Sequence, residues 1–296
     1  MEGVRLLTPT QLYNLLNANG LYPMLSDPNY LLLLDARSRA SYDESHILTA
    51  KKAPTDESGR FMLPYDSELE CKLNIVVYDS NTRNLKEETQ AFDCAKLLWK
   101  FGSRFEVKVL EGGYEDFSAL YPYLRTQDVI FMPRGNRRIE TYPIEIIPSL
   151  LYLGNWRHGN TPYIQKDLKI KGHINCQLEP GSFFKEEGKN LLHIAIEDNI
   201  DSDIYSKFQP SCEFIEEKMS RDQAVLVFSH MGLSTSVTIV IAYLMRLYTW
   251  SLAEAYTYVQ MCKPDIRPNR GFIRELSQWE EGILGEKETD ISDPNF

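Results

Sequence analysis

Nine consecutive residues in the second half of the chain carry the side chains best suited to chemistry. They are Phe228, Ser229, His230, Met231, Gly232, Leu233, Ser234, Thr235 and Ser236. A loop with a glycine at its turn and a helix directly after it directs backbone N–H groups toward one point, where the positive end of the helix stabilises an anion. Ser229 could also act as a nucleophile if a base took its proton. The loop therefore predicts either a phosphate site or a hydrolase site.

Two elements must hold this loop in place. Residues 225–227 form a short β-branched run typical of a buried strand, and residues 237–245 are apolar on every face, as in a buried helix. The candidate base, His230, directly follows Ser229, and neighbouring side chains diverge in an extended or loop backbone. The pattern predicts a strand, a phosphate-cradling loop and a helix, and it disfavours a serine–histidine pair.

The same loop resembles the signature of the dual-specificity protein phosphatases, His-Cys-x-Ala-Gly-x-Ser-Arg-Ser. The register is set by Gly232, Ser234, Ser236 and the helical run Ala-Tyr-Leu-Met at 242–245. Four positions depart from the family pattern: Phe228 replaces its histidine, Ser229 its nucleophilic cysteine, Met231 its alanine and Thr235 its phosphate-binding arginine. The resemblance implies that the scaffold is retained and that the catalytic groups are absent.

Each of the main replacements removes a separate part of the family's reaction. A cysteine with an ordinary pKa of about 8.5 becomes a thiolate when loop amides and a helix N-terminus stabilise it, whereas the hydroxyl of Ser229 is far too weak an acid. Arginine grips two phosphoryl oxygens and stabilises the transition state, which Thr235 cannot do. Losing hydrogen bonds to a charged group costs about 1.5–3 kcal/mol each. The chain is therefore expected to have no phosphatase activity.

The composition limits the class of function. The chain has 296 residues, enough for two domains with separate cores. Its net charge of −10 argues against a nucleic-acid surface or a membrane-binding face, both of which need clustered positive charge. The expected partners are signalling proteins, such as another phosphatase or a phosphoprotein.

The cysteines and the N-terminal residues bear on the compartment. The five cysteines have no CxxC pair, no metal-ligand spacing and no paired framework, so we expect a reducing compartment and neither metal nor cofactor. The first residues contain no apolar core of a secretory signal, and the longest apolar run is well short of the roughly 20 residues of a membrane span. We expect a cytoplasmic protein, and mitochondrial import is left open.

The first half alternates between predicted strands and helices. Thr8 and Pro9 open a helix, residues 30–34, 74–78 and 107–110 read as buried strands, and residues 88–101 and 114–121 as helices. Alternation of this kind gives a parallel α/β layer. The order of these elements, with Asp-x-Arg at 35–37 and Glu-Gly-Gly-Tyr at 111–114, resembles the rhodanese-like domain.

Sulfur transfer is not expected from this half. Active rhodaneses carry a sulfur-accepting cysteine just after the strand matched by residues 75–78, and here that place holds Asp79. For Asp35 and Arg37 a structural ion pair is expected in preference to a catalytic role, because charges next to a buried strand need partners.

A rhodanese-like half followed by a phosphatase-like half resembles the MAP kinase phosphatases, whose first half docks a kinase through basic residues. Here Lys51, Lys52, Arg60 and Lys72 are interspersed with five acidic residues, which is typical of a solvated loop and argues against kinase docking. The only basic cluster, Arg134, Arg137 and Arg138, lies in a predicted linker.

The second half follows the element order of the dual-specificity phosphatases. Strands are expected at 170–176 and 191–196, a helix at 205–219, and a last helix after the Pro-Asn-x-Gly-Phe turn at 268–272. Asp198 falls at the position of the family's general acid. Without nucleophile and arginine it has no reaction to complete, so we expect an ordinary residue of an acidic loop.

The expected domains are a rhodanese-like (CH2) domain at 1–132, a linker at 133–141, a dual-specificity-phosphatase-like α/β domain at 142–285, and a polar, disordered tail at 286–296. Three hypotheses follow. The preferred one is a pseudophosphatase that regulates signalling by binding and competing with or inhibiting other proteins. The alternatives are a cryptic hydrolase that uses Ser229, His230 and Asp198, and an adaptor that acts only through the rhodanese-like half.

Overall fold

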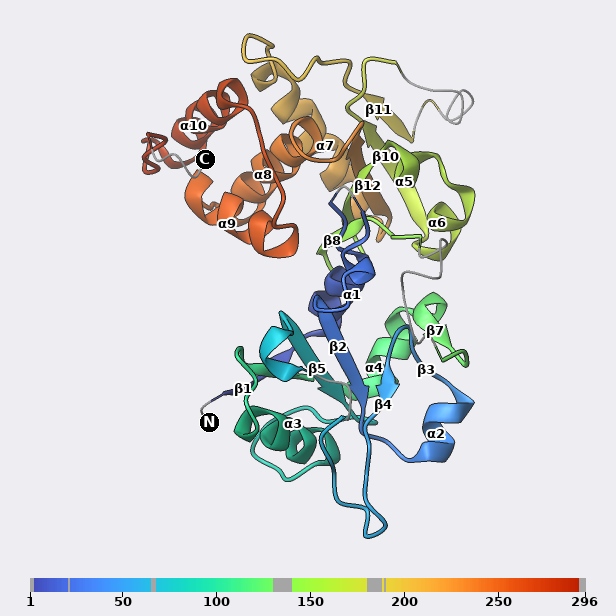
Figure 1. Cartoon of the computed structure of the whole chain (residues 1–296). Coiled ribbons are helices and arrows are strands. Elements are labelled where there is room, and N and C mark those ends of the chain that lie inside the picture. The colour runs from blue at the N-terminus through green and yellow to red at the C-terminus, as the bar shows by residue number, and fades with distance from the viewer. Residues whose placement is uncertain are drawn as a thin grey trace. The chain divides into compact units, whose positions relative to one another are not determined.

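The structure is a computed structural model in which the chain divides into two compact units, Met1–Thr141 and Tyr142–Phe296 (Figure 1). It describes residues 3–20, 22–64, 68–129, 140–179, 188 and 190–292. The predicted linker at 133–141 and the cluster of Arg134, Arg137 and Arg138 fall almost entirely outside the described residues.

The first unit is built on a parallel sheet. Its strands are β1 (Val4–Leu7), β2 (Leu31–Asp35), β3 (His46–Ile47), β4 (Lys51–Lys52), β5 (Asn74–Tyr78), β6 (Val107–Leu110) and β7 (Arg125–Thr126). Its α-helices are α1 (Pro9–Asn17), α2 (Arg39–Glu44), α3 (Gln90–Lys100) and α4 (Gly113–Leu120). The main sheet has the order β1-β6-β5-β2-β4 with every pair parallel, while β3 and β7 form a small antiparallel pair. The expected parallel α/β layer is confirmed.

Local sequence explains the ends of several elements in this unit. Thr8 caps α1 by accepting from the Gln11 N–H, and the Gln11 side chain accepts from the Thr8 N–H, so both donors at the helix start are satisfied. The β5 strand begins and ends at the expected residues. The β1 strand was not expected: it carries an exposed arginine and is completed only by pairing with β6.

The second unit is an α/β domain with five strands. These are β8 (Ile144–Ile147), β9 (Leu151–Asn155), β10 (Ile170–Asn175), β11 (Leu191–His193) and β12 (Ala224–Ser229). The helices are α5 (Trp156–Asn160), α6 (Pro162–Asp167), α7 (Tyr205–Met219), α8 (Thr235–Tyr248), α9 (Leu252–Cys262) and α10 (Arg270–Leu284). The sheet order is β11-β10-β12-β9-β8, parallel except for the antiparallel β8–β9 pair. The α7 helix has the expected bounds, whereas β11 is shorter than the strand predicted at 191–196.

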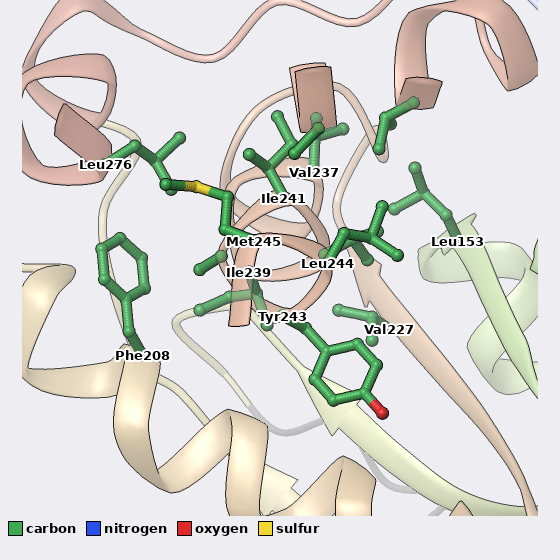
Figure 2. Close-up of a cluster of buried hydrophobic side chains, with 14 of the residues drawn as sticks. Leu153, Phe208, Val227, Val237, Ile239, Ile241, Tyr243, Leu244, Met245 and Leu276 are labelled. Atoms are coloured by element: carbon green, nitrogen blue, oxygen red, sulfur yellow. The ribbon is translucent and has the colours of Figure 1, made fainter. Parts of the chain in front are cut away.

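The α8 helix forms the centre of the second unit. Residues 235–245 are all buried, so the helix packs on every side. Figure 2 shows its side chains between Phe208 of α7, Leu276 of α10, and Val227 and Leu153 of the sheet. This packing fixes the start of α8, and with it the loop that joins β12 to α8.

The end of the chain differs from the sequence expectation. The predicted disordered tail began after Gly285, but residues 286–292 contact the domain. The Thr289 hydroxyl donates to Glu280 over 2.6 Å and accepts from the Ala253 N–H, while the Ile291 carbonyl accepts from Arg270. Glu280 is fully buried and needs these donors, which the local composition of the tail does not reveal.

His173 on β10 is expected to make the second unit sensitive to acid. Its side chain is buried, its Nε2 lies 2.7 Å from the side-chain amide oxygen Oε1 of Gln165, and burial lowers the pKa of the imidazole to about 4. Below pH 6.5 the unfolded chain binds a proton that the folded chain takes up only near pH 4. The fold should therefore lose up to about 3 kcal/mol of stability between pH 6.5 and pH 4.

Denaturant unfolding at pH 7, 5.5 and 4.5 tests this effect. His173→Gln removes the titrating group, so its stability should fall less over this range than that of the unsubstituted chain. An equal fall in both proteins would show that His173 does not cause the acid sensitivity.

Among the described residues, none of the helices has the length and apolar character needed to cross a membrane. No group of histidine, cysteine and carboxylate side chains suited to holding a metal ion occurs in the same described ranges.

Candidate functional site

The loop from Ser229 to Thr235 joins the end of β12 to the start of α8. It turns at Gly232, whose φ of +71° is unfavourable for a residue with a side chain. A Cβ atom at this position would also lie 2.6 Å from the Gly154 carbonyl oxygen. Glycine is thus required both by the turn and by the close approach of β9, and the loop has the tight form expected of an anion cradle.

The hydroxyl of Ser229 has two hydrogen-bond partners within the loop and helix. Its Oγ accepts from the Gly232 N–H over 3.1 Å and lies 2.9 Å from the Ser236 Oγ. Among the described residues, no hydrogen bond joins Ser229 to His230. The His230 side chain is exposed, and its carbonyl accepts from the Trp156 N–H. The predicted divergence of the two side chains fits this arrangement.

Phe228 is fully buried at the end of β12 and packs against a glycine. A Cβ on Gly159 of α5 would lie 2.5 Å from the Phe228 ring, so this position leaves room for the ring only because it is glycine. Phe228 therefore belongs to the core.

Asp198 is tied to the loop and to the segment before α10. Its Oδ1 accepts from the Ser234 hydroxyl and from the Asn269 side-chain amide, each over 2.7 Å. The Ser234 Oγ in turn lies 3.3 Å from the Asn269 N–H, which donates to it. The carboxylate thus joins three segments, a positioning role that was not foreseen from the sequence.

A cleft of about 740 Å³ lies beside the loop. Its lining includes the loop residues Ser229, His230, Met231, Leu233, Ser234 and Thr235. The charged residues of its lining are Glu179, Glu197, Asp198 and Arg267. With three carboxylates and one guanidinium, the described lining carries a formal charge of −2 when His230 is neutral.

Cys176 also lines the cleft but is not an activated nucleophile. Burial raises the pKa of its thiol far above the ordinary range. Burial likewise raises the pKa to about 12 for Cys94 and Cys212 and to about 11 for Cys262, and a hydrogen bond with Glu68 raises that of Cys71. All five cysteines are thus thiols at neutral pH, and a thiol is a poor nucleophile.

This state of the cysteines can be checked by thiol labelling. Cys71 is the exposed cysteine, while the others are buried or partly buried. At pH 7.5 we expect the native chain to react at one thiol, slowly, and all five to react after unfolding. Cys71→Ala should remove the native reaction, and a second rapidly labelled thiol would contradict the absence of an activated cysteine.

In the first unit, the loop that follows β5 has its backbone N–H groups bonded to a carboxylate. Asp79 follows β5, is 6% exposed, and accepts hydrogen bonds from the N–H groups of Asn81, Thr82 and Ala91 and from the Thr82 hydroxyl. Ala91 lies in the first turn of α3, so the Asp79 carboxylate occupies the end of the helix that attracts anions. A carboxylate held in this way is not a sulfur acceptor.

A second cleft, of about 650 Å³, lies in the first unit. Its charged lining consists of Arg37, Arg39, Lys52, Arg60 and Asp93. The sequence suggested that the basic residues are interspersed with acids, but folding brings Lys52 and Arg60 together with two arginines from another segment. Arg37 and Arg39 are paired with Asp35 and Asp43, which lowers the charge they present.

Comparison with known families agrees with both halves of the fold. Residues 17–120 match the rhodanese-like domain, and residues 151–282 match the family described as dual specificity phosphatase, catalytic domain. The chain combines a rhodanese-like domain with a dual-specificity phosphatase domain.

Two similar proteins are both named dual specificity protein phosphatases. The dual specificity protein phosphatase Mpk3 of Drosophila melanogaster is 39% identical over 142 residues, which are 48% of this chain and 34% of the fly protein. Human dual specificity protein phosphatase 16 is 28% identical over 279 residues, or 86% of this chain and 41% of the human protein. The chain thus spans less than half the length of these relatives.

One solved structure of a phosphatase-like protein is also similar to this chain. The human tyrosine phosphatase-like serine/threonine/tyrosine-interacting protein is 32% identical, covers 47% of this chain and 96% of its own, and aligns with a TM-score of 0.42.

Proposed function

We propose that this protein is a catalytically inactive, phosphatase-like regulator that binds other signalling proteins and competes with or inhibits them. The observation that carries the proposal is Ser229, a hydroxyl at the end of β12 where the family reaction needs a thiolate. The phosphatase-like half is also similar in sequence to a human protein whose name describes it as tyrosine phosphatase-like and interacting.

The surroundings of Ser229 support inactivity. A serine nucleophile needs a base within hydrogen-bond reach, and within the described part of the chain its Oγ contacts a second hydroxyl and an amide instead. Thr235 cannot supply the charge of the family's arginine. Asp198 is engaged in holding Ser234 and Asn269.

The surface next to the loop favours a protein partner. Met231 is 58% exposed and Leu178 56% exposed, and both line the cleft. Trp156, which follows β9 and bonds to the loop backbone, is half exposed. Large exposed apolar side chains beside a cleft are typical of protein-binding surfaces.

Phosphate release from a phosphopeptide tests the proposal. The full chain should release no more phosphate than its Ser229→Ala variant, and a serine-directed probe should not label Ser229. Release that Ser229→Ala abolishes, or labelling at Ser229, would instead support the cryptic hydrolase.

The cleft of the rhodanese-like domain favours one second candidate, an adaptor that acts through this half. Its lining has four cations and one acid, a surface suited to an acidic segment. When a binding partner has been identified, its binding to the full-chain variants Arg60→Glu and Met231→Glu distinguishes the two candidate functions. Loss of binding with Met231→Glu alone supports the phosphatase-like domain as the binding half, and loss with Arg60→Glu alone supports the adaptor.

A further inference from the structure

The cleft beside Ser229 retains unused hydrogen-bond donors. The α8 helix begins at Thr235, so its first N–H groups have no acceptor inside the helix. Among the described residues, no acceptor is found for the N–H groups of Met231, Leu233 and Ser234. These donors form the anion cradle that the turn at Gly232 creates.

A hydroxyl that lines the same cleft also lacks a partner. Thr235 is 4% exposed and lines the cleft, and no hydrogen bond to its hydroxyl is found within the described ranges. A ligand that accepts hydrogen bonds would supply one for Thr235.

Arg267 brings a positive charge to the cleft from another segment. Its N–H donates to the Leu233 carbonyl over 2.7 Å, which fixes its backbone against the loop. The side chain is exposed and lines the cleft, and no carboxylate within the described part of the chain forms an ion pair with it. A guanidinium in this place can grip an anion held by the loop amides.

The wall of the cleft is acidic. Glu179, Glu197 and Asp198 outnumber the single guanidinium, so the described lining has an excess of two negative charges. An isolated phosphate dianion would be repelled by this wall. A ligand must therefore combine an anionic group for the loop with positive charge for the wall.

We propose that the cleft binds a phosphorylated residue flanked by lysine or arginine, with Arg267 in the role of the arginine that is missing at position 235. The loop amides and the Thr235 hydroxyl donate to the phosphoryl oxygens, and Glu179 and Glu197 contact the basic flanks. The partner is a phosphoprotein. An anionic membrane is disfavoured by the net charge of −10. This inference rests on the proposed function and names the ligand of the same site.

Four peptides test the inference with the full chain: one sequence with phosphotyrosine between basic residues, one with phosphotyrosine between acidic residues, and the unphosphorylated form of each. Binding should be tightest for the basic phosphopeptide. Removing its phosphate or changing its flanks to acidic should each weaken binding about tenfold or more. Equal binding of the phosphorylated and unphosphorylated basic peptides would overturn the inference.

Variants assign the contacts. Arg267→Gln should weaken binding of the basic phosphopeptide about ten- to hundredfold and leave the unphosphorylated peptide unaffected. Arg274→Gln is the matched control, because Arg274 is an exposed arginine of α10 outside the cleft lining. Thr235→Val should cost about fivefold. If Arg267→Gln behaves like Arg274→Gln, the assignment of Arg267 is wrong.

Glu197→Gln tests the acidic wall. It should raise the affinity for the phosphopeptide with acidic flanks and reduce the preference for basic flanks, and an unchanged preference would contradict the role of the wall. Phosphate release is measured in the same samples, so that the two proposals are tested separately. Release of phosphate would contradict the proposed function. Binding that does not depend on phosphate would contradict only this inference.

Discussion

Replacing Phe228, Ser229 and Thr235 together by histidine, cysteine and arginine is expected to turn this protein into a phosphatase. In the native chain Ser229 Oγ accepts a hydrogen bond from the Gly232 N–H and lies next to the Ser236 hydroxyl at the start of α8. The cysteine sulfur would have the same two neighbours. Such surroundings lower a thiol pKa from about 8.5 into a range of about 3.5–7.5. The triple variant should therefore hold a thiolate at neutral pH.

The arginine should decide how fast the variant works. Thr235 lines the cleft, so an arginine there extends toward the loop amides and stabilises the transition state. Removing one such donor from an enzyme typically costs about 100- to 1000-fold in rate. We expect the triple variant to exceed Phe228→His with Ser229→Cys by a factor of that order in phosphate release.

Two controls accompany this measurement. Thiol labelling at pH 6 and 8 reports whether the new cysteine is ionised, and unfolding curves report whether the variant folds. A folded triple variant with a reactive thiol and no activity would show that the geometry of the loop, including the bulk of Met231 or the engagement of Asp198, is unsuited to the reaction.

Arg37→Ala should cause the largest loss of stability among single substitutions considered for the rhodanese-like domain. Arg37 Nη2 and Nε donate to the Asp35 carboxylate over 2.6–3.1 Å, and Nη2 also donates to the Ser45 carbonyl. Its guanidinium carbon lies 3.8 Å from the centre of the Tyr114 ring. Asp35 has a side chain with 0% exposure, so removing Arg37 leaves a buried charge without its partner. The expected loss is about 3–5 kcal/mol in the free energy of unfolding.

Denaturant unfolding followed by Trp99, the one tryptophan of residues 1–141, measures this loss. The double variant Asp35→Ala with Arg37→Ala should lose less than the sum of the two single variants, because no charge stays buried alone. Arg39→Ala is the matched control, since Arg39 pairs with Asp43 on the surface and should change stability little. An Arg37→Ala curve identical to that of Arg39→Ala would refute the role of the buried pair.

Much of the fold could be predicted from the sequence because local patterns determine it. The β-branched runs of β5 and β12, the cap at Thr8 and the periodicity of α10 each identify an element without knowledge of its neighbours, whereas α7 was expected from the element order of the family. The β1 strand was missed, since its pairing with β6 depends on residues about a hundred positions away. The docking of Thr289 onto Glu280 was missed for the same reason.

The candidate site was located from the sequence, but its electrostatics were not. The register of Gly232 and Ser234 predicts the loop, and the replacements within it stay a prediction. Arg267 is far from the loop in sequence, and it joins the cleft through folding, which places it in the lining and bonds its N–H to the Leu233 carbonyl. Likewise, the joining of Asp198 to Ser234 and Asn269 depends on tertiary packing that no local pattern encodes.

The most direct test of the central claim, binding without catalysis, is a single-turnover experiment with the full chain in excess over the basic phosphopeptide. Excess protein makes even very slow chemistry visible, since every peptide can be bound. The account predicts that the peptide is bound and recovered with its phosphate intact. Release of phosphate that is lost in Ser229→Ala would contradict it.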